Sequence, residues 1–189
     1  PGIDAIGFIE STKSKKFKIG QEVIVSGYDL GMNTPGGFGE YIRVPRSWAC
    51  HLPKNLTAIE SMAIGTAGLT AGLCIKKLKK LNGINGKNAV VTGATGGVGS
   101  FAIKLLKLLG AKVTAITSKL NEEDFLKMIG VDDIIFKKDF ITSVRKPMAK
   151  GIWDIAIDTV GGEILSNLIP SMKYGGAITC CGNVAGPSF

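Results

Sequence analysis

"VTGATGGVGS", Val91 to Ser100, places four glycines within seven residues. Residues 88–92, which lead into its first glycine, are a short apolar run that is typical of a buried parallel strand. From the last part of this stretch onward, apolar residues recur at spacings of three and four, which predicts one apolar stripe of a helix: Val98, Ala102, Leu105, Leu106 and Leu109. Glycines between a strand and a helix let the backbone approach a pyrophosphate, and the helix N-terminus offers unpaired N–H groups. The stretch therefore predicts a phosphate-binding turn.

The second half of the chain alternates strand and helix patterns. Strands are expected at residues 88–92, 112–117, 133–136, 153–158 and 177–181. Such alternation implies right-handed β-α-β units and a parallel sheet covered on both faces. The predicted fold class is α/β, a doubly wound Rossmann sheet.

The first half has a different pattern. The segments "DAIGFIE", "QEVIVSGY" and "GEYIRVP" within residues 1–53 are short strand-like pieces separated by turns. Thr57 and Glu60 then form a capping box ahead of a long apolar helix that is expected to end near Leu81. We predict a partial β domain over residues 1–56 and a nucleotide-binding domain over 57–189, incomplete at its C-terminal end.

The composition limits the classes of function. With 45% apolar residues and no uninterrupted apolar run of about 18, the chain is expected to be globular with no membrane span. The net charge of +8 comes from lysine runs that read as solvated faces, so no nucleic-acid partner is expected. Four cysteines without C-x-x-C spacing predict a reduced, cytoplasmic protein, with the adjacent pair Cys180 and Cys181 buried in a strand.

Two dinucleotide fingerprints fit the glycine loop. It matches G-x-G-x-x-G with alanine in the first glycine slot, and also T-G-x-x-x-G-x-G of short-chain dehydrogenases. Short-chain enzymes use a tyrosine with a lysine four residues later. None of Tyr28, Tyr41 or Tyr174 has one, and 87 residues precede the loop's strand, so the short-chain reading is rejected.

The order "PGIDAIGFI", "KIGQEVIV", "GGFGEYIRVP", "AIGTAGLTA" and "VTGATGGVG" resembles the medium-chain dehydrogenase/reductase superfamily along the whole chain. The resemblance implies a GroES-like β domain followed by the nucleotide-binding domain. "GTAGLTAGLC", "DTVGG" and "YGG" followed by "CG" resemble its quinone-oxidoreductase branch, and within it acryloyl-CoA reductases. Complete members are longer at both ends, so the chain is expected to be an internal fragment, with a homodimer expected for the full-length protein.

The resemblance also implies a test for metal. Zinc members carry G-H-E and a cysteine at the positions that here read Gly2-Ile3-Asp4 and Thr66. Isoleucine cannot coordinate zinc, and a threonine hydroxyl is a poor substitute for a thiolate. No metal site is expected, and the only histidine, His51, is interpreted as a surface or packing residue.

The expected cofactor is NADP. About 20 residues beyond the glycine loop, where an acid would bind the ribose of NAD, the chain has Ser118 and Lys119. Further contacts are expected from the glycine loop, from the turn after the fourth strand, from the end of the fifth strand, and from a helix residue near the nicotinamide. These predicted contacts are Thr95, Gly96, Gly97, Val98, Thr159, Val160, Gly182 and Thr70.

The implied reaction is hydride transfer to an activated C=C bond of an acryloyl-CoA-like enoyl thioester, without zinc. An NADPH:quinone reductase and a non-catalytic NADPH-binding protein remain as alternatives. The position of Asp158 predicts a residue that caps or pins the turn after its strand. No catalytic residue can be named, because no proton donor is identified.

Overall fold

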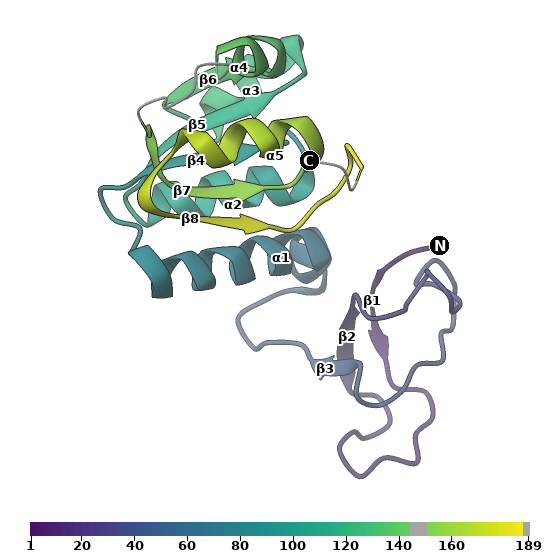
Figure 1. The fold of residues 1–189 in the computed structure, drawn as a ribbon. Coiled ribbons are helices and arrows are strands. Elements are labelled where there is room, and N and C mark those ends of the chain that lie inside the picture. The colour runs from purple at the N-terminus through teal and green to yellow at the C-terminus, as the bar shows by residue number, and fades with distance from the viewer. Residues whose placement is uncertain (144–150, 187–189) are drawn as a thin grey trace. The chain divides into compact units, whose positions relative to one another are not determined.

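The computed structural model describes residues 1–143 and 151–186. The chain divides into two compact units, residues 1–69 and 70–189, which we call the β unit and the nucleotide unit. Helix α1 (Ala58–Asn82) runs across this division (Figure 1). The domain boundary that we predict at Thr57 stays a prediction.

The nucleotide unit contains a five-stranded sheet in the order β6-β5-β4-β7-β8, and all four strand pairs are parallel. The strands are β4 (Asn88–Thr92), β5 (Lys112–Thr117), β6 (Asp133–Phe136), β7 (Trp153–Asp158) and β8 (Met172–Cys180). The predicted doubly wound fold is confirmed, with four strands at the expected bounds. Strand β8 begins five residues early, because the polar and glycine residues 173–176 and a register shift opposite Trp153 hide its first half.

Helices cover both faces of this sheet. The later part of α1 packs on one face together with α2 (Gly97–Leu108) and α3 (Glu123–Met128). The other face is covered by α4 (Lys137–Ser143) and α5 (Gly162–Leu168). Short 3-10 helices span Leu120–Glu122 and Ile169–Ser171. Alternate strand residues face opposite cores, since Val91 lies in the first core and Val90 in the second.

The β unit has a three-stranded antiparallel sheet in the order β1-β2-β3. Its strands are β1 (Asp4–Phe8), β2 (Glu22–Ser26) and β3 (Ala49–His51). The strand predicted for "GEYIRVP" is wrong, because residues 39–45 take irregular structure. Ile42 and Val44 still pack against the small core of this unit, so their alternation marks burial and not strand pairing.

The predicted capping box opens α1. The Glu60 amide donates to Thr57 Oγ1 at 3.2 Å, and the Thr57 amide donates to Glu60 Oε2 at 2.8 Å. By length and composition alone this helix could cross a membrane. However, it is broken at Gly65, and its residues Ala71 and Leu78 are fully buried in the core of the nucleotide unit. The later part of the helix therefore packs in the core of the nucleotide unit, while only 28% of its most apolar 18 residues are buried.

Candidate functional site

A pocket of about 450 Å³ opens beside the carboxyl ends of the parallel strands. Parallel α/β sheets bind ligands at this edge, and the volume lies within the roughly 300–1,000 Å³ of ligand sites. The pocket is lined by Gly93, Thr95, Gly96, Ile116, Thr117, Ser118, Lys119, Lys137, Thr159, Val160, Ile164, Val184 and Ala185. Six of the ten predicted cofactor contacts are therefore brought together: Thr95, Gly96, Ser118, Lys119, Thr159 and Val160.

The glycine loop joins β4 to α2 in a conformation that other residues would not adopt. Gly93 has φ +59°, and a side chain there would collide with Thr159 Oγ1. A Cβ at Gly99 would lie 2.9 Å from Ala94 Cα, so glycine lets the helix approach the loop. The Gly96 amide already donates to Gly93 O at 2.9 Å. The first-turn amides of Gly97 and Val98 have no partner four residues back within α2, as at any helix start.

A buried carboxylate holds the glycine loop against the turn after β7. Asp158 has no solvent exposure, and its carboxylate accepts hydrogen bonds from Thr92 Oγ1 and from the Gly161 amide. Thr92 Oγ1 in turn accepts the Thr159 amide at 3.0 Å, and Thr159 Oγ1 donates to Thr92 O at 3.0 Å. Asp158 thus pins two pocket-lining turns together, as its position predicts, and does not face a ligand.

Two lysines give the pocket a positive rim. Ser118 and Lys119 follow β5, and the Lys119 amide donates to Thr117 Oγ1 at 3.1 Å. Lys137, which our sequence analysis missed, follows β6 and also lines the pocket. Lys137 lies just past a parallel strand, as Lys119 does, so its position was a usable sequence signal. Among the described residues that line the pocket, none is acidic.

The segment after β8 closes the far side of the pocket. Val184 and Ala185 line it, and the Ala185 amide donates to Val160 O at 2.9 Å. A Cβ at Gly182 would collide with the Thr159 backbone, so glycine is needed for this segment to pass. Neither Val184 nor Ala185 carries a sequence signal, because both make apolar or backbone contacts.

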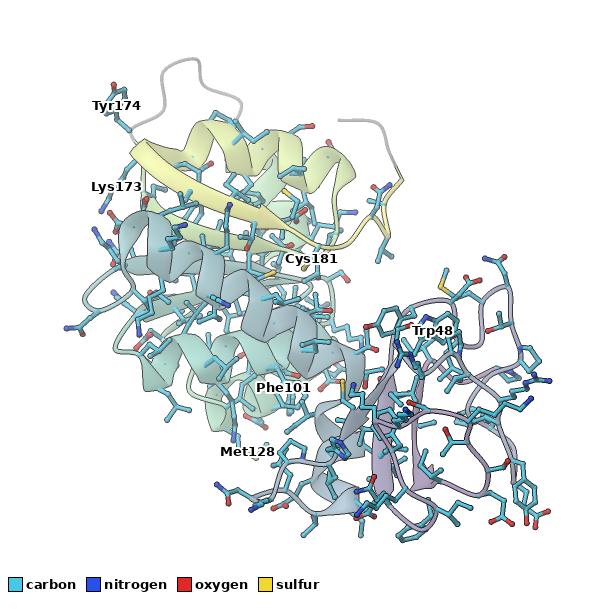
Figure 2. All side chains as sticks on the ribbon, turned by 90° about the horizontal axis from the view of Figure 1, so that it is seen from below. Trp48, Phe101, Met128, Lys173, Tyr174 and Cys181 are labelled. Carbon is cyan, nitrogen blue, oxygen red and sulfur yellow. The ribbon has the colours of Figure 1, made fainter. Side chains whose placement is uncertain are left out.

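The cysteine pair at the end of β8 is exposed, not buried as predicted (Figure 2 labels Cys181). β8 is the edge strand of the described sheet, and this pair stands at its carboxyl end. Even so, partial burial and the neighbouring Cys74 thiol raise the pKa of Cys181 to about 12. Its thiol is protonated at neutral pH, which argues against a nucleophilic role.

Four predicted contacts do not line the pocket. Gly97 and Val98 form the first turn of α2, and Thr70 lies within α1. Gly182 contacts the turn after β7 instead. Their contacts with a cofactor stay predictions.

The chain is similar to known oxidoreductases. The zinc-binding dehydrogenase family matches residues 97–189. The acrylyl-CoA reductase AcuI of Ruegeria pomeroyi is 35% identical over 187 residues, 98% of this chain and 57% of the relative. Over nearly its whole length the chain is similar to reductases of the medium-chain dehydrogenase/reductase superfamily. The chain spans little more than half the length of this reductase.

Two solved structures from the superfamily are similar over nearly the whole chain. Escherichia coli K-12 YhdH with bound NADPH has a TM-score of 0.93 and 38% identity, and the match covers 100% of this chain and 58% of that one. Bacillus subtilis yhfP with NAD bound has a TM-score of 0.91 and 39% identity, covering 98% and 57%.

The family's name raises the question of zinc. Asp4 Oδ1 accepts the Thr66 hydroxyl at 2.8 Å, and Asp4 Oδ2 accepts the Thr66 amide at 3.0 Å. One carboxylate bonded to a threonine is not a zinc donor set. The part of the chain that the structure describes contains no group of three His, Cys, Asp or Glu that could hold a metal ion. These residues do not fit zinc.

A second hollow, of about 410 Å³, lies in the β unit beside His51 and Lys54. His51 packs its ring against Phe17 with centroids 4.9 Å apart. This matches the packing interpretation of His51, and no glycine lines the hollow among the residues that the structure describes.

Proposed function

We propose that the protein is an NADPH-dependent, zinc-independent reductase that adds hydride to an activated C=C bond of an acryloyl-CoA-like enoyl thioester. The observation that carries this proposal is the pocket at the carboxyl edge of the sheet, with a glycine loop at one side and an acid-free, two-lysine rim at the other. The named activity of AcuI and the NADPH bound in YhdH support it.

The residues present fit NADPH. The first-turn amides of Gly97 and Val98 would hold the pyrophosphate, because the helix N-terminus favours negative charge. Ser118, Lys119 and Lys137 would hold the 2′-phosphate, since two ammonium groups and a hydroxyl suit a dianion. An NAD site would instead place a carboxylate there. The NAD in yhfP argues for measuring this preference directly.

Bound NADPH would supply a hydride to the β-carbon of the alkene. The protein must orient the acceptor and stabilise the negative charge that develops on the thioester oxygen. Buried Asp158 is committed to the turns, and the raised pKa of Cys181 makes its thiol a very weak acid. Neither is therefore assigned as the proton donor.

The preference for NADPH is tested by charge reversal at the rim. Lys119→Glu and Lys137→Glu should each raise the KM for NADPH by about 10- to 100-fold, because a charge-assisted bond of roughly 1.5–3 kcal/mol is lost. The KM for NADH should change little. Lys80→Glu makes the same change of net charge on an exposed part of α1 and serves as the control. Equal effects on both cofactors would contradict the assignment.

A second candidate, an NADPH:quinone reductase, differs in the charge of its substrate. NADPH oxidation measured with acryloyl-CoA and with a simple naphthoquinone separates the two, and turnover of the quinone alone would favour the second. NADPH binding without turnover of either would favour a non-catalytic NADPH-binding protein. Activity lost on chelation and restored by zinc would overturn the zinc-independent mechanism.

We also propose a small-molecule substrate, a cytoplasmic location and a homodimeric full-length protein. The four cysteines are free, which suits a reducing compartment. Size-exclusion chromatography with light scattering tests the assembly.

A further inference from the structure

Helix α1 contains a second helix start. Gly65 has φ 47° and ψ −158°, which no α-helix accommodates, so the helix that runs into the nucleotide unit starts afresh at Thr66. The first amides of a helix have no partner within it. Because Gly65 is buried, water is a poor substitute for such a partner.

Asp4 supplies that partner from a distant part of the sequence. Its carboxylate accepts the Thr66 amide at 3.0 Å and the Thr66 hydroxyl at 2.8 Å, across 62 residues. A carboxylate at a helix N-terminus is favoured both as a cap and by the helix dipole. A Cβ at residue 65 would lie 2.8 Å from Asp4 Oδ2, so both the space and the φ angle require glycine.

Unusual backbone conformations gather at the same place. Gly27 has φ +72°, its amide donates to Ile3 O at 2.8 Å, and a Cβ there would lie 3.9 Å from Thr66 Oγ1. Next to it, Tyr28 has φ 54° and is the sole non-glycine residue with positive φ among those the structure describes. Such strain persists only where surrounding structure enforces it, and it concentrates at functional sites.

We infer that Asp4 is a positioning residue, which caps the helix at Thr66 and fixes on β1 the start of the helix that runs from one unit into the other. A chain that passes between units through a broken helix can swivel at the break. The cap removes this freedom, because the Thr66 amide and hydroxyl are both held by one carboxylate. Its effect on turnover rests on the proposed function, since alignment of an alkene with a nicotinamide is sensitive to small displacements.

The test is Asp4→Asn in the complete protein. Asparagine keeps one acceptor oxygen, but its NH₂ group cannot accept the Thr66 amide and the charge is lost. Hydrogen exchange in peptides covering 63–69 should rise about fivefold, the size expected for a lost cap. Exchange in β4 and β5 should not change. Small-angle scattering should show a broader distribution of intramolecular distances.

Binding and turnover should then separate. The dissociation constant for NADPH should stay within about twofold of the wild-type value, because the pocket lies wholly within the nucleotide unit, whereas kcat/KM for the alkene should fall about tenfold. Thr66→Ser keeps both donors and should behave like the wild type. Glu10→Gln removes an exposed carboxylate of the same unit and is the matched control.

Wild-type exchange over 63–69 in Asp4→Asn would overturn the cap. Raised exchange with an unchanged distance distribution would overturn the positioning role. A wild-type protein that reduces no activated alkene would refute the proposed function alone, since exchange and scattering still decide the role of Asp4.

Discussion

The two units bury their apolar residues in different ways. The nucleotide unit builds a core on each face of its sheet, and strands β4 and β7 are almost wholly buried. The β unit relies on one small core: Phe17, Val23, Val25, Leu30 and Ala49. Exposed apolar side chains occur in both units, such as Phe38 in the β unit at 84% and Leu108 in the nucleotide unit at 81%. The nucleotide unit is stabilised by layered packing, and the β unit by turns and a few long-range contacts.

The largest expected difference between the units is the stability that each loses when a buried core leucine is shortened to alanine. Leu106 and Leu30 are both fully buried, one in each unit. Leu106→Ala should lower the free energy of unfolding of the nucleotide unit by about 3–5 kcal/mol, because its layered surroundings cannot collapse into the cavity. Leu30→Ala should cost about 2–3 kcal/mol in the β unit, where the irregular segments can relax.

The two tryptophans make this measurable, since Trp48 lies in the β unit and Trp153 in the nucleotide unit. Urea unfolding followed by fluorescence in Trp48→Phe and Trp153→Phe backgrounds reports each unit separately. If both transitions shift together in both leucine variants, the units unfold as one body and the comparison fails.

A smaller effect is expected in the glycine loop. Gly99→Ala places a Cβ against backbone atoms of Gly93 and Ala94, so the nucleotide unit should lose about 1–3 kcal/mol. NADPH binding should weaken, because the loop must move. Gly72→Ala is the control: it lies within α1 with no atom near its added Cβ, and should gain roughly 0.5–1 kcal/mol. Equal losses in both variants, with binding intact, would show that close packing at Gly99 is unimportant.

The same contrast explains what the sequence could reveal. The nucleotide unit was predictable because its strands are local apolar runs followed by turns, and because the carboxyl ends of parallel strands share one edge. Thus Ser118 and Lys119 could be placed beside the glycine loop before any coordinates were known. Val184 and Ala185 were missed because backbone and apolar contacts leave no motif.

The β unit was less predictable for a physical reason. The segment "GEYIRVP" has the alternation of a strand, yet pairing depends on a neighbour that local sequence cannot specify. The Asp4 cap on Thr66 joins residues 62 positions apart, and each residue alone has an ordinary interpretation. Motifs that report one segment are readable, whereas contacts between distant segments are not.

The smallest expected effect concerns the amino ends of the parallel strands, at the end of β4 that lies away from the glycine loop. Asp154 accepts the Asn88 amide at 2.9 Å and pairs with Lys173 at 3.0 Å, while Figure 2 shows Lys173 at the other end of β8 from Cys181. Partial burial raises the pKa of Asp154, but the hydrogen bond from Asn88 and the Lys173 ammonium outweigh it, so the pKa is lowered overall. Asp154→Asn should therefore cost the nucleotide unit about 1–2 kcal/mol at neutral pH.

The sign of the pH dependence follows from that lowered pKa. A carboxylate whose folded pKa lies below its unfolded value of about 3.9 contributes its full stability above that value, and loses it as the pH falls through the folded pKa. The difference between wild type and Asp154→Asn should thus be constant from pH 7 to 5 and shrink below about pH 4. Urea unfolding of the Trp48→Phe background at these pH values measures it.

Asp133→Asn is the control, because its carboxylate is exposed and meets Lys112 only at 3.6 Å, so it should change stability by less than about 0.5 kcal/mol. A difference between wild type and Asp154→Asn that persists at pH 2 would mean that Asp154 acts through packing and not through its charge.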